Sequence, residues 1–378
     1  MDASQAKKRF KQKYCPLVNE KPPNSAPIHG RGASWSPANR FEKLHVDLSD
    51  IDVVDVDPAE EEERPRRATQ YFREGSKTII TRNNSPDVGF EASVNPYRGC
   101  EHGCIYCYAR PTHEYLGFSA GLDFESKIMV KTDAPGLLRA ELESPHWRPQ
   151  VIVMSGVTDP YQPVEKRLRI TRRCLEVLAK FRNPVAIITK NRLVTRDVDL
   201  LQKLAKFDAV AVNISITSLD PKLQRVLEPR TSSPEARLDA IKQLRAARIP
   251  VGVMVAPIIP GLTDHEAPKI LEACAQAGAQ FAGYTIVRLP WAVAPLFERW
   301  LEEHFPDRKE KVLGRIRDLR GNSRLNNSEW HTRMTGEGIF AEQIAALFKV
   351  GRRRAGIGAR PQLSTASFRP PREQLTLW

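Results

Sequence analysis

Three short apolar runs decide the expected fold of this 378-residue chain: VIVM at residues 151–154, VAIIT at 185–189 and VGVMV at 251–255. Each run is rich in β-branched residues and short, which is typical of a strand. Because the runs are apolar at consecutive positions, we expect both faces of the resulting sheet to be covered. The runs therefore predict a parallel sheet.

Helical patterns alternate with the strands between Phe90 and Trp300. This alternation predicts either a partial or full (β/α) barrel or a doubly wound sheet, with the chemistry on loops that follow the strands. Ser233 and Asp264 are expected to cap two helices, and Gly278 is expected to end the second of these. The expected strands are 92–95, 151–155, 185–189, 209–216, 251–255 and 281–287, and the expected helices are 170–181, 196–206, 234–248 and 265–277.

Composition excludes several classes of protein. Hydrophobic residues make up 41% of the chain, but no run approaches the roughly 20 apolar residues of a membrane span. The first 15 residues have no apolar centre, so a secretory signal is not expected. Six cysteines are too few for a disulfide scaffold. We therefore expect a cytoplasmic protein without a membrane anchor, and a monomer by default.

Charge divides the chain into expected parts. The net charge is +13, and residues 308–378 alone hold fifteen Lys and Arg against six Asp and Glu. A basic surplus of this kind fits either an anionic partner such as nucleic acid or simple solubility. The expected parts are a largely disordered arm (1–75) in which only residues 30–35 dock, a (β/α) barrel (76–305), a helical extension (306–350) and a flexible tail (351–378).

The strongest motif is CEHGCIYC at residues 100–107, directly after the first expected strand. Three thiolates on one tight loop can hold three irons of a [4Fe–4S] cluster and leave the fourth iron open. Gly99 and Gly103 let the backbone fold closely around such a group. A zinc site remains an alternative, because His102 or His113 could supply a fourth ligand.

The segment NPYRGCEHGCIYCYAR (95–110) resembles the radical S-adenosylmethionine (SAM) superfamily, and residues 77–290 resemble its branch related to spore photoproduct lyase. The resemblance implies a partial (β/α)6 barrel of the TIM type, a [4Fe–4S] cluster and bound SAM. It also implies reductive cleavage of SAM to a 5′-deoxyadenosyl radical, which abstracts hydrogen from a substrate. An electron donor such as flavodoxin or ferredoxin is then expected.

The resemblance also implies roles for individual residues. Cys100, Cys104 and Cys107 match the cluster ligands. The cofactor contacts that it implies are Tyr106 beside the adenine, Ser155 and Asp159 near the methionine amine, Lys190 against the carboxylate, Asn213 and Ser215 as polar contacts, and Glu228, Arg230 and residues 255–261 around the site. For Glu228 and Arg230, the alternative is that they pair only with each other.

The chain departs from the lyase pattern at one point. The lyase returns a hydrogen atom through a cysteine near the end of the second strand, whereas MSGVTDPYQ (154–162) contains none. Tyr161 is a candidate donor in its place. Cys15 is expected to be a tail thiol, and Cys174 and Cys274 are expected to pack helices.

The last five residues, Gln374–Trp378 (QLTLW), resemble the peptide by which bacterial proteins bind the DNA sliding clamp. A stray hydrophobic end is the alternative. Together with the lyase-like core, this peptide favours a lesion or base in DNA as the substrate. The competing functions are modification of RNA, a peptide or a metabolite, and a non-enzymatic zinc protein that binds nucleic acid.

Overall fold

A computed structural model describes residues 27–41, 68–321 and 324–369. Its main sheet has seven strands in the order β10-β9-β8-β7-β6-β3-β2. All neighbours are parallel except β2 and β3, which are antiparallel. The strands are β2 (Ile80–Arg82), β3 (Ala92–Val94), β6 (Ile152–Met154), β7 (Val185–Thr189), β8 (Val210–Ser215), β9 (Val251–Ile258) and β10 (Phe281–Ile286).

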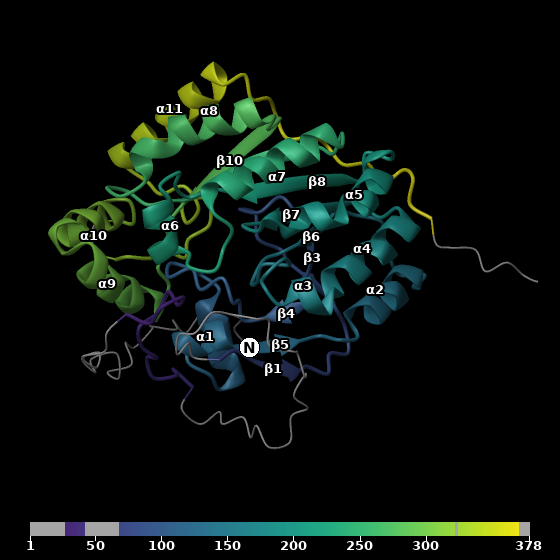
Figure 1. The fold of residues 1–378 in the computed structure, drawn as a ribbon, viewed down its shortest axis with the longest axis horizontal. Coiled ribbons are helices and arrows are strands. Elements are labelled where there is room, and N and C mark those ends of the chain that lie inside the picture. The colour runs from purple at the N-terminus through teal and green to yellow at the C-terminus, as the bar shows by residue number, and fades with distance from the viewer. Residues whose placement is uncertain (1–26, 42–67, 322–323, 370–378) are drawn as a thin grey trace, which may run out of the picture.

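The six parallel strands are those expected from the sequence, and the (β/α)6 fold class is confirmed. Helices after the strands form an arc around the outer face of the curved sheet (Figure 1). They are α2 (Ala134–Glu143), α3 (Glu165–Leu168), α4 (Ile170–Phe181), α5 (Val198–Ala205), α7 (Pro234–Ala246) and α8 (Ala267–Ala277). Two more helices, α6 (Pro221–Leu227) and α9 (Val293–His304), lie at the left of Figure 1 and belong to a second hydrophobic cluster.

The two faces of the sheet differ in chemistry. Outward side chains such as Ile187, Val212 and Val253 are fully buried and belong to the main hydrophobic core. The neighbouring inward positions on β8 and β9 are polar or small, as at Asn213 and Gly252. Both faces are buried, as expected, but the inward face carries the polar and small side chains.

Helix ends follow the expected chemistry in two of three cases. The Ser233 hydroxyl accepts a hydrogen bond from the Ala236 amide and caps α7. Gly278 ends α8 in the left-handed region. Asp264 does not cap α8, since a 3₁₀ turn, η4 (Asp264–Glu266), precedes that helix and the Asp264 carboxylate instead pairs with Arg315 at 3.1 Å. The helix expected at 196–206 likewise begins with a 3₁₀ helix, η3 (Arg192–Asp197).

A smaller sheet lies below the main one, in the order β1-β5-β4 (Figure 1). Strand β1 falls inside the arm that the sequence suggested would be largely disordered, yet it pairs in parallel with β5. Residues 30–35 dock as expected, with Arg31 to Ser34 buried. The elements around this sheet are β1 (Gln70–Arg73), β4 (Tyr97–Arg98), β5 (Lys127–Val130), the 3₁₀ helix η2 (Arg110–Leu116) and α1 (Leu122–Ser126).

The C-terminal part contains α10 (Lys309–Asp318), preceded by the 3₁₀ turn η5 (Pro306–Arg308), and α11 (Ile339–Arg354). The tail expected to be flexible from Gly351 instead packs on the core as far as residue 369. Gly358 bridges to Phe281, and the Phe368 ring lies 6.2 Å from that of Phe181.

Residues 1–26, 42–67, 322–323 and 370–378, which include Cys15 and the proposed clamp peptide, lie outside the described residues. Among the helices that the structure does describe, none is both long and apolar enough to cross a membrane.

Candidate functional site

The three-cysteine loop begins where β4 ends and closes tightly on itself. Gly99 and Gly103 have φ values of 76° and 65°, as their expected role requires. A Cβ on Gly99 would lie 2.9 Å from the Phe124 carbonyl oxygen. Glycine is therefore needed for the loop to approach α1.

A buried ion pair holds this loop in place. Arg110 donates to the carbonyl oxygens of Gly103 at 3.1 Å and Cys104 at 3.0 Å, and its guanidinium pairs with Glu125. Glu125 also accepts hydrogen bonds from the amides of Gly32 at 3.0 Å and Ala33 at 2.9 Å. The carboxylate thus ties the N-terminal segment and the cysteine loop together.

The donor set fits an iron–sulfur cluster. Cys100 and Cys104 are buried and Cys107 is half-buried. Burial raises the pKa of Cys107 to about 11 and that of Cys104 well above its ordinary value. Thiols in such surroundings ionise when a metal supplies positive charge. Cys100, Cys104 and Cys107 would each hold one iron.

The structure does not assemble the alternative zinc site. His102 lies 3.4 Å from the Asp159 carboxylate, and His113 Nε2 lies 2.9 Å from the Lys127 carbonyl oxygen. Within the described ranges, no group of three His, Cys, Asp or Glu side chains converges to hold a single metal ion. His113 is therefore bonded to Lys127, whereas His102 lies between Asp159 and Cys100.

Three predicted residues and Arg237 form one buried polar cluster beside the loop, and the predicted segment 255–261 touches it at Ala256. The Tyr106 hydroxyl donates to the Glu228 carboxylate, which pairs with Arg237 and with Lys190 at 3.5 Å. Lys190 Nζ donates to the Ala256 carbonyl oxygen at 2.8 Å, in the 255–261 segment expected to face the site. Tyr106, Lys190, Glu228 and residue 256 therefore lie together in the structure.

This cluster holds two cations, Arg237 and Lys190, against the single carboxylate of Glu228. Burial alone would raise the pKa of Glu228, but Arg237 and then Lys190 hold it well below its usual range. Burial raises the pKa of Tyr106 well above its ordinary value, so this phenol remains a hydrogen-bond donor at neutral pH. The cluster thus places a buried group of ion-paired side chains beside the cysteine loop.

Ser155 and Asp159 lie in the loop after β6. Both Asp159 oxygens already accept hydrogen bonds, from Thr189 Oγ1 at 2.7 Å and the Lys190 amide at 2.8 Å. Ser155 adopts φ 144°, and its hydroxyl lies 3.2 Å from the Thr158 carbonyl oxygen. In this arrangement Asp159 orients β7 and His102, whereas Ser155 lies at the half-buried edge of the loop.

Asn213 and Ser215 lie two residues apart on β8, on the inward face of the sheet, and each is 4% exposed. The Asn213 amide lies 3.5 Å from the Ile187 carbonyl oxygen. Among the described residues no hydrogen bond of the Ser215 hydroxyl is seen. Ser215 is therefore the more available of the two for a ligand.

Arg230 and Tyr161 are placed elsewhere. Arg230 pairs with Glu101 at 3.3 Å, so the alternative that it pairs with Glu228 is wrong. Tyr161 is fully buried in the main hydrophobic core, and its hydroxyl lies 3.2 Å from Asp197. This enclosure does not bring Tyr161 to the cysteine loop as a hydrogen donor. Cys174 is also fully buried, in α4, as expected of a packing residue.

Sequence reasoning missed the buried charges that support the site. Arg110, Glu125 and Arg237 are at most 1% exposed. Charged residues of this kind are usually exposed, so only their nearness to the motif could have pointed to them.

Comparisons with known proteins agree with this geometry. The radical SAM superfamily model matches residues 94–274. An uncharacterized protein of Mycobacterium tuberculosis is 39% identical over 240 residues, which cover 62% of this chain and 69% of that protein. An uncharacterized protein of Methanocaldococcus jannaschii is 31% identical over 59% of this chain and 80% of its own length.

A more distant relative is the Radical SAM Nalpha-GlyT isomerase of Pseudomonas phage M6, 23% identical over 58% of this chain and 44% of that protein. Among solved structures, spore photoproduct lyase complexed with dinucleoside spore photoproduct has a TM-score of 0.54 at 17% identity, covering 76% of this chain and 80% of that one. This likeness shows a shared fold. Members of the superfamily use a [4Fe–4S] cluster and SAM. With its cysteine loop, its sheet and these relatives, the chain belongs to the radical SAM superfamily.

Proposed function

We propose that the protein reductively cleaves SAM and uses the resulting radical to abstract hydrogen from a component of DNA. The observation that carries the proposal is the three-cysteine loop set beside the polar cluster of Tyr106, Lys190 and Glu228 at the ends of the strands. When bound, the cluster and SAM supply a 5′-deoxyadenosyl radical. The protein itself supplies buried ligands, fixed charges and a polar inner sheet face.

The proposed cofactor contacts rest on the family resemblance, and the hydrogen bonds of the site support them. Cys100, Cys104 and Cys107 hold the cluster, and Tyr106 and Ser215 present hydroxyls near the cofactor. Lys190 supplies the positive charge that a carboxylate attracts. Asp159 acts as a positioning residue, since its oxygens are already bonded within the protein.

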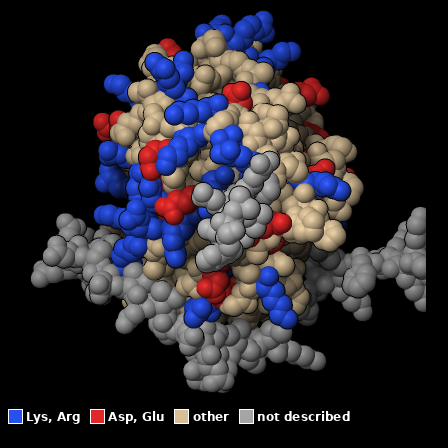
Figure 2. Space-filling model, turned by 90° about the vertical axis from the view of Figure 1, so that its right-hand side faces the viewer, with Lys and Arg blue, Asp and Glu red and all other residues tan. Residues whose placement is uncertain are grey.

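Two features support DNA as the substrate. Lys and Arg side chains clearly outnumber Asp and Glu on the face that Figure 2 shows, in keeping with a net charge of +13. The solved structure that shares the fold holds a dinucleoside. The proposed reaction differs from lyase repair in its hydrogen donor, since residues 154–162 contain no cysteine.

The clamp peptide at Gln374–Trp378, a flavodoxin or ferredoxin as electron donor, and a cytoplasmic monomer complete the proposal. Recruitment to DNA through the clamp is tested by calorimetry with a peptide of residues 372–378. No binding at high micromolar peptide overturns that part alone.

The test of the substrate uses isotope transfer. Reconstituted enzyme, SAM and dithionite are incubated with DNA, RNA or peptides from cells grown in deuterium oxide, and 5′-deoxyadenosine is analysed by mass spectrometry. Deuterium transferred from DNA supports the proposal. Transfer from RNA or peptide alone replaces DNA with that substrate class. Cleavage without transfer from any pool overturns the proposed substrate.

A further inference from the structure

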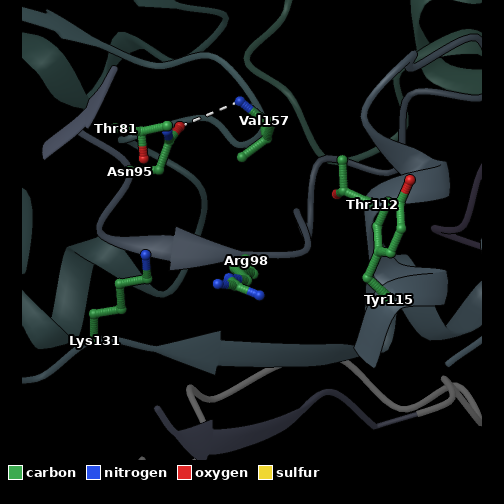
Figure 3. Close-up of a pocket in the computed structure, with 7 residues that line it drawn as sticks. All are labelled: Thr81, Asn95, Arg98, Thr112, Tyr115, Lys131 and Val157. Carbon is green, nitrogen blue, oxygen red and sulfur yellow. Dashed lines mark hydrogen bonds between the residues drawn. The ribbon is translucent and has the colours of Figure 1, made fainter. Parts of the chain in front are cut away.

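A pocket of about 300 Å³ lies beside the cysteine loop (Figure 3). One wall is shared with the loop: Val157 packs against the small cluster that contains Cys100, and its amide donates to Asn95 Oδ1 at 3.2 Å. The pocket is lined by Thr81, Asn95, Arg98, Thr112, Tyr115, Lys131 and Val157. None of these residues belongs to the polar cluster of Tyr106, Lys190 and Glu228, so the proposed cofactor contacts do not account for this pocket.

The pocket carries more positive than negative charge. Arg98 Nε lies 3.2 Å and Lys131 Nζ 4.0 Å from the same oxygen of Glu74. In the described part of the chain, Glu74 is the one carboxylate within 4.0 Å of either cation. Lys131 is only 8% exposed, and a buried charge without a full counterion is costly. An anion seated here would complete the balance.

The pocket rim adds an aromatic surface. The Tyr115 side chain is 61% exposed, and its ring stacks on Phe41 at a centroid distance of 5.0 Å. Figure 3 places Tyr115 across the pocket from Lys131, with Arg98 between them. Exposed aromatic rings next to cationic grooves are the surfaces on which unpaired nucleobases stack.

We infer that this pocket binds a phosphate of the substrate, in a nucleic acid strand whose neighbouring base stacks on Tyr115. The strand as the source of the phosphate rests on the proposed DNA substrate. The pocket itself rests on its own charge and shape. A phosphate held here would lie beside Val157, which packs against the cluster that contains Cys100, so the adjoining nucleotide would lie near the cysteine loop.

The test changes Arg98→Gln and compares it with Arg139→Gln. Both arginine side chains are 41% exposed and pair with a glutamate, but Arg139 lies on α2 and does not line the pocket. Binding of fluorescein-labelled single-stranded DNA is measured by anisotropy over a range of salt. Arg98→Gln is expected to weaken binding roughly tenfold and to reduce the salt slope by about 0.7, the value for one phosphate contact on a single strand. Arg139→Gln is expected to match the unchanged protein.

Two further variants secure the outcome. Lys131→Gln should reproduce the lower slope, and Tyr115→Ala should weaken binding without changing the slope. If Arg98→Gln and Lys131→Gln both keep the affinity and salt slope of the unchanged protein, with unfolding unchanged, the phosphate site is overturned. A third outcome is that the unchanged protein binds thymidine monophosphate or inorganic phosphate but not DNA, and that Arg98→Gln abolishes this binding. In that case the pocket stands and the DNA substrate fails.

Discussion

The Arg110–Glu125 ion pair gives the sharpest prediction about the contacts that hold the cysteine loop in place. Both side chains are 0% exposed, and the carboxylate also accepts the Gly32 and Ala33 amides. Glu125→Gln removes the charge while keeping the size, so the Arg110 cation stays buried without its partner. Removing one member of a buried pair typically costs about 3–5 kcal/mol, roughly a fifth or more of the stability of an ordinary domain.

The assay is urea unfolding of the anaerobically purified protein, followed by tryptophan fluorescence. The control is Glu176→Gln, which changes a 51% exposed glutamate paired with Arg172 at 3.6 Å and should cost less than about 1 kcal/mol. Hydrogen exchange of the Gly32 and Ala33 amides should also accelerate in Glu125→Gln only. A loss below about 1 kcal/mol for Glu125→Gln, or unchanged exchange at both amides, would refute the reasoning.

Three further predictions follow from particular contacts. Gly32→Ala should release the N-terminal segment, because its Cβ would lie 1.8 Å from the Gly103 carbonyl oxygen; limited proteolysis that cuts the variant no faster would contradict this. Gly252→Ala should lower the free energy of unfolding by about 1–3 kcal/mol, because its Cβ would lie 2.3 Å from the Phe281 ring, whereas Gly314→Ala, with open space around it, should not be destabilising in the same denaturation assay. Burial lowers the pKa of His113 to about 4. The contribution of the neutral imidazole to the free energy of unfolding should be complete above the unfolded pKa of about 6.5. It should be lost as the pH falls towards 4, because the unfolded chain binds the proton at a higher pH than the folded chain does. A titration of unfolding free energy in which His113→Gln keeps the same slope between these pH values would count against that assignment.

Local sequence patterns predicted the parallel strands and α4 because β-branched runs and 3.6-residue periodicity act over a few residues. The cysteine loop was equally visible, since its ligands and glycines are contiguous. Strand β1 was missed because its four residues pair with β5, more than 50 residues away.

The partners of buried charged residues also could not be predicted from the sequence. Glu228 was placed at the site, but its true partner is Arg237 rather than Arg230, and chain geometry alone decides between two nearby arginines. The segment after Gly351 is rich in Arg and Pro and so resembles a flexible tail. It nevertheless packs, because Phe368 contacts Phe181 and the Arg369 amide donates to the Phe181 carbonyl oxygen at 2.9 Å.

The central claim is tested most directly by iron, acid-labile sulfide and zinc analysis of protein purified without oxygen. The variants are Cys100→Ala, Cys104→Ala and Cys107→Ala, with Cys274→Ala as the control for a buried cysteine outside the loop. The account predicts about four irons and four sulfides per chain, lost in each loop variant and kept in the control. One zinc without sulfide, or iron retained in the loop variants, would contradict it.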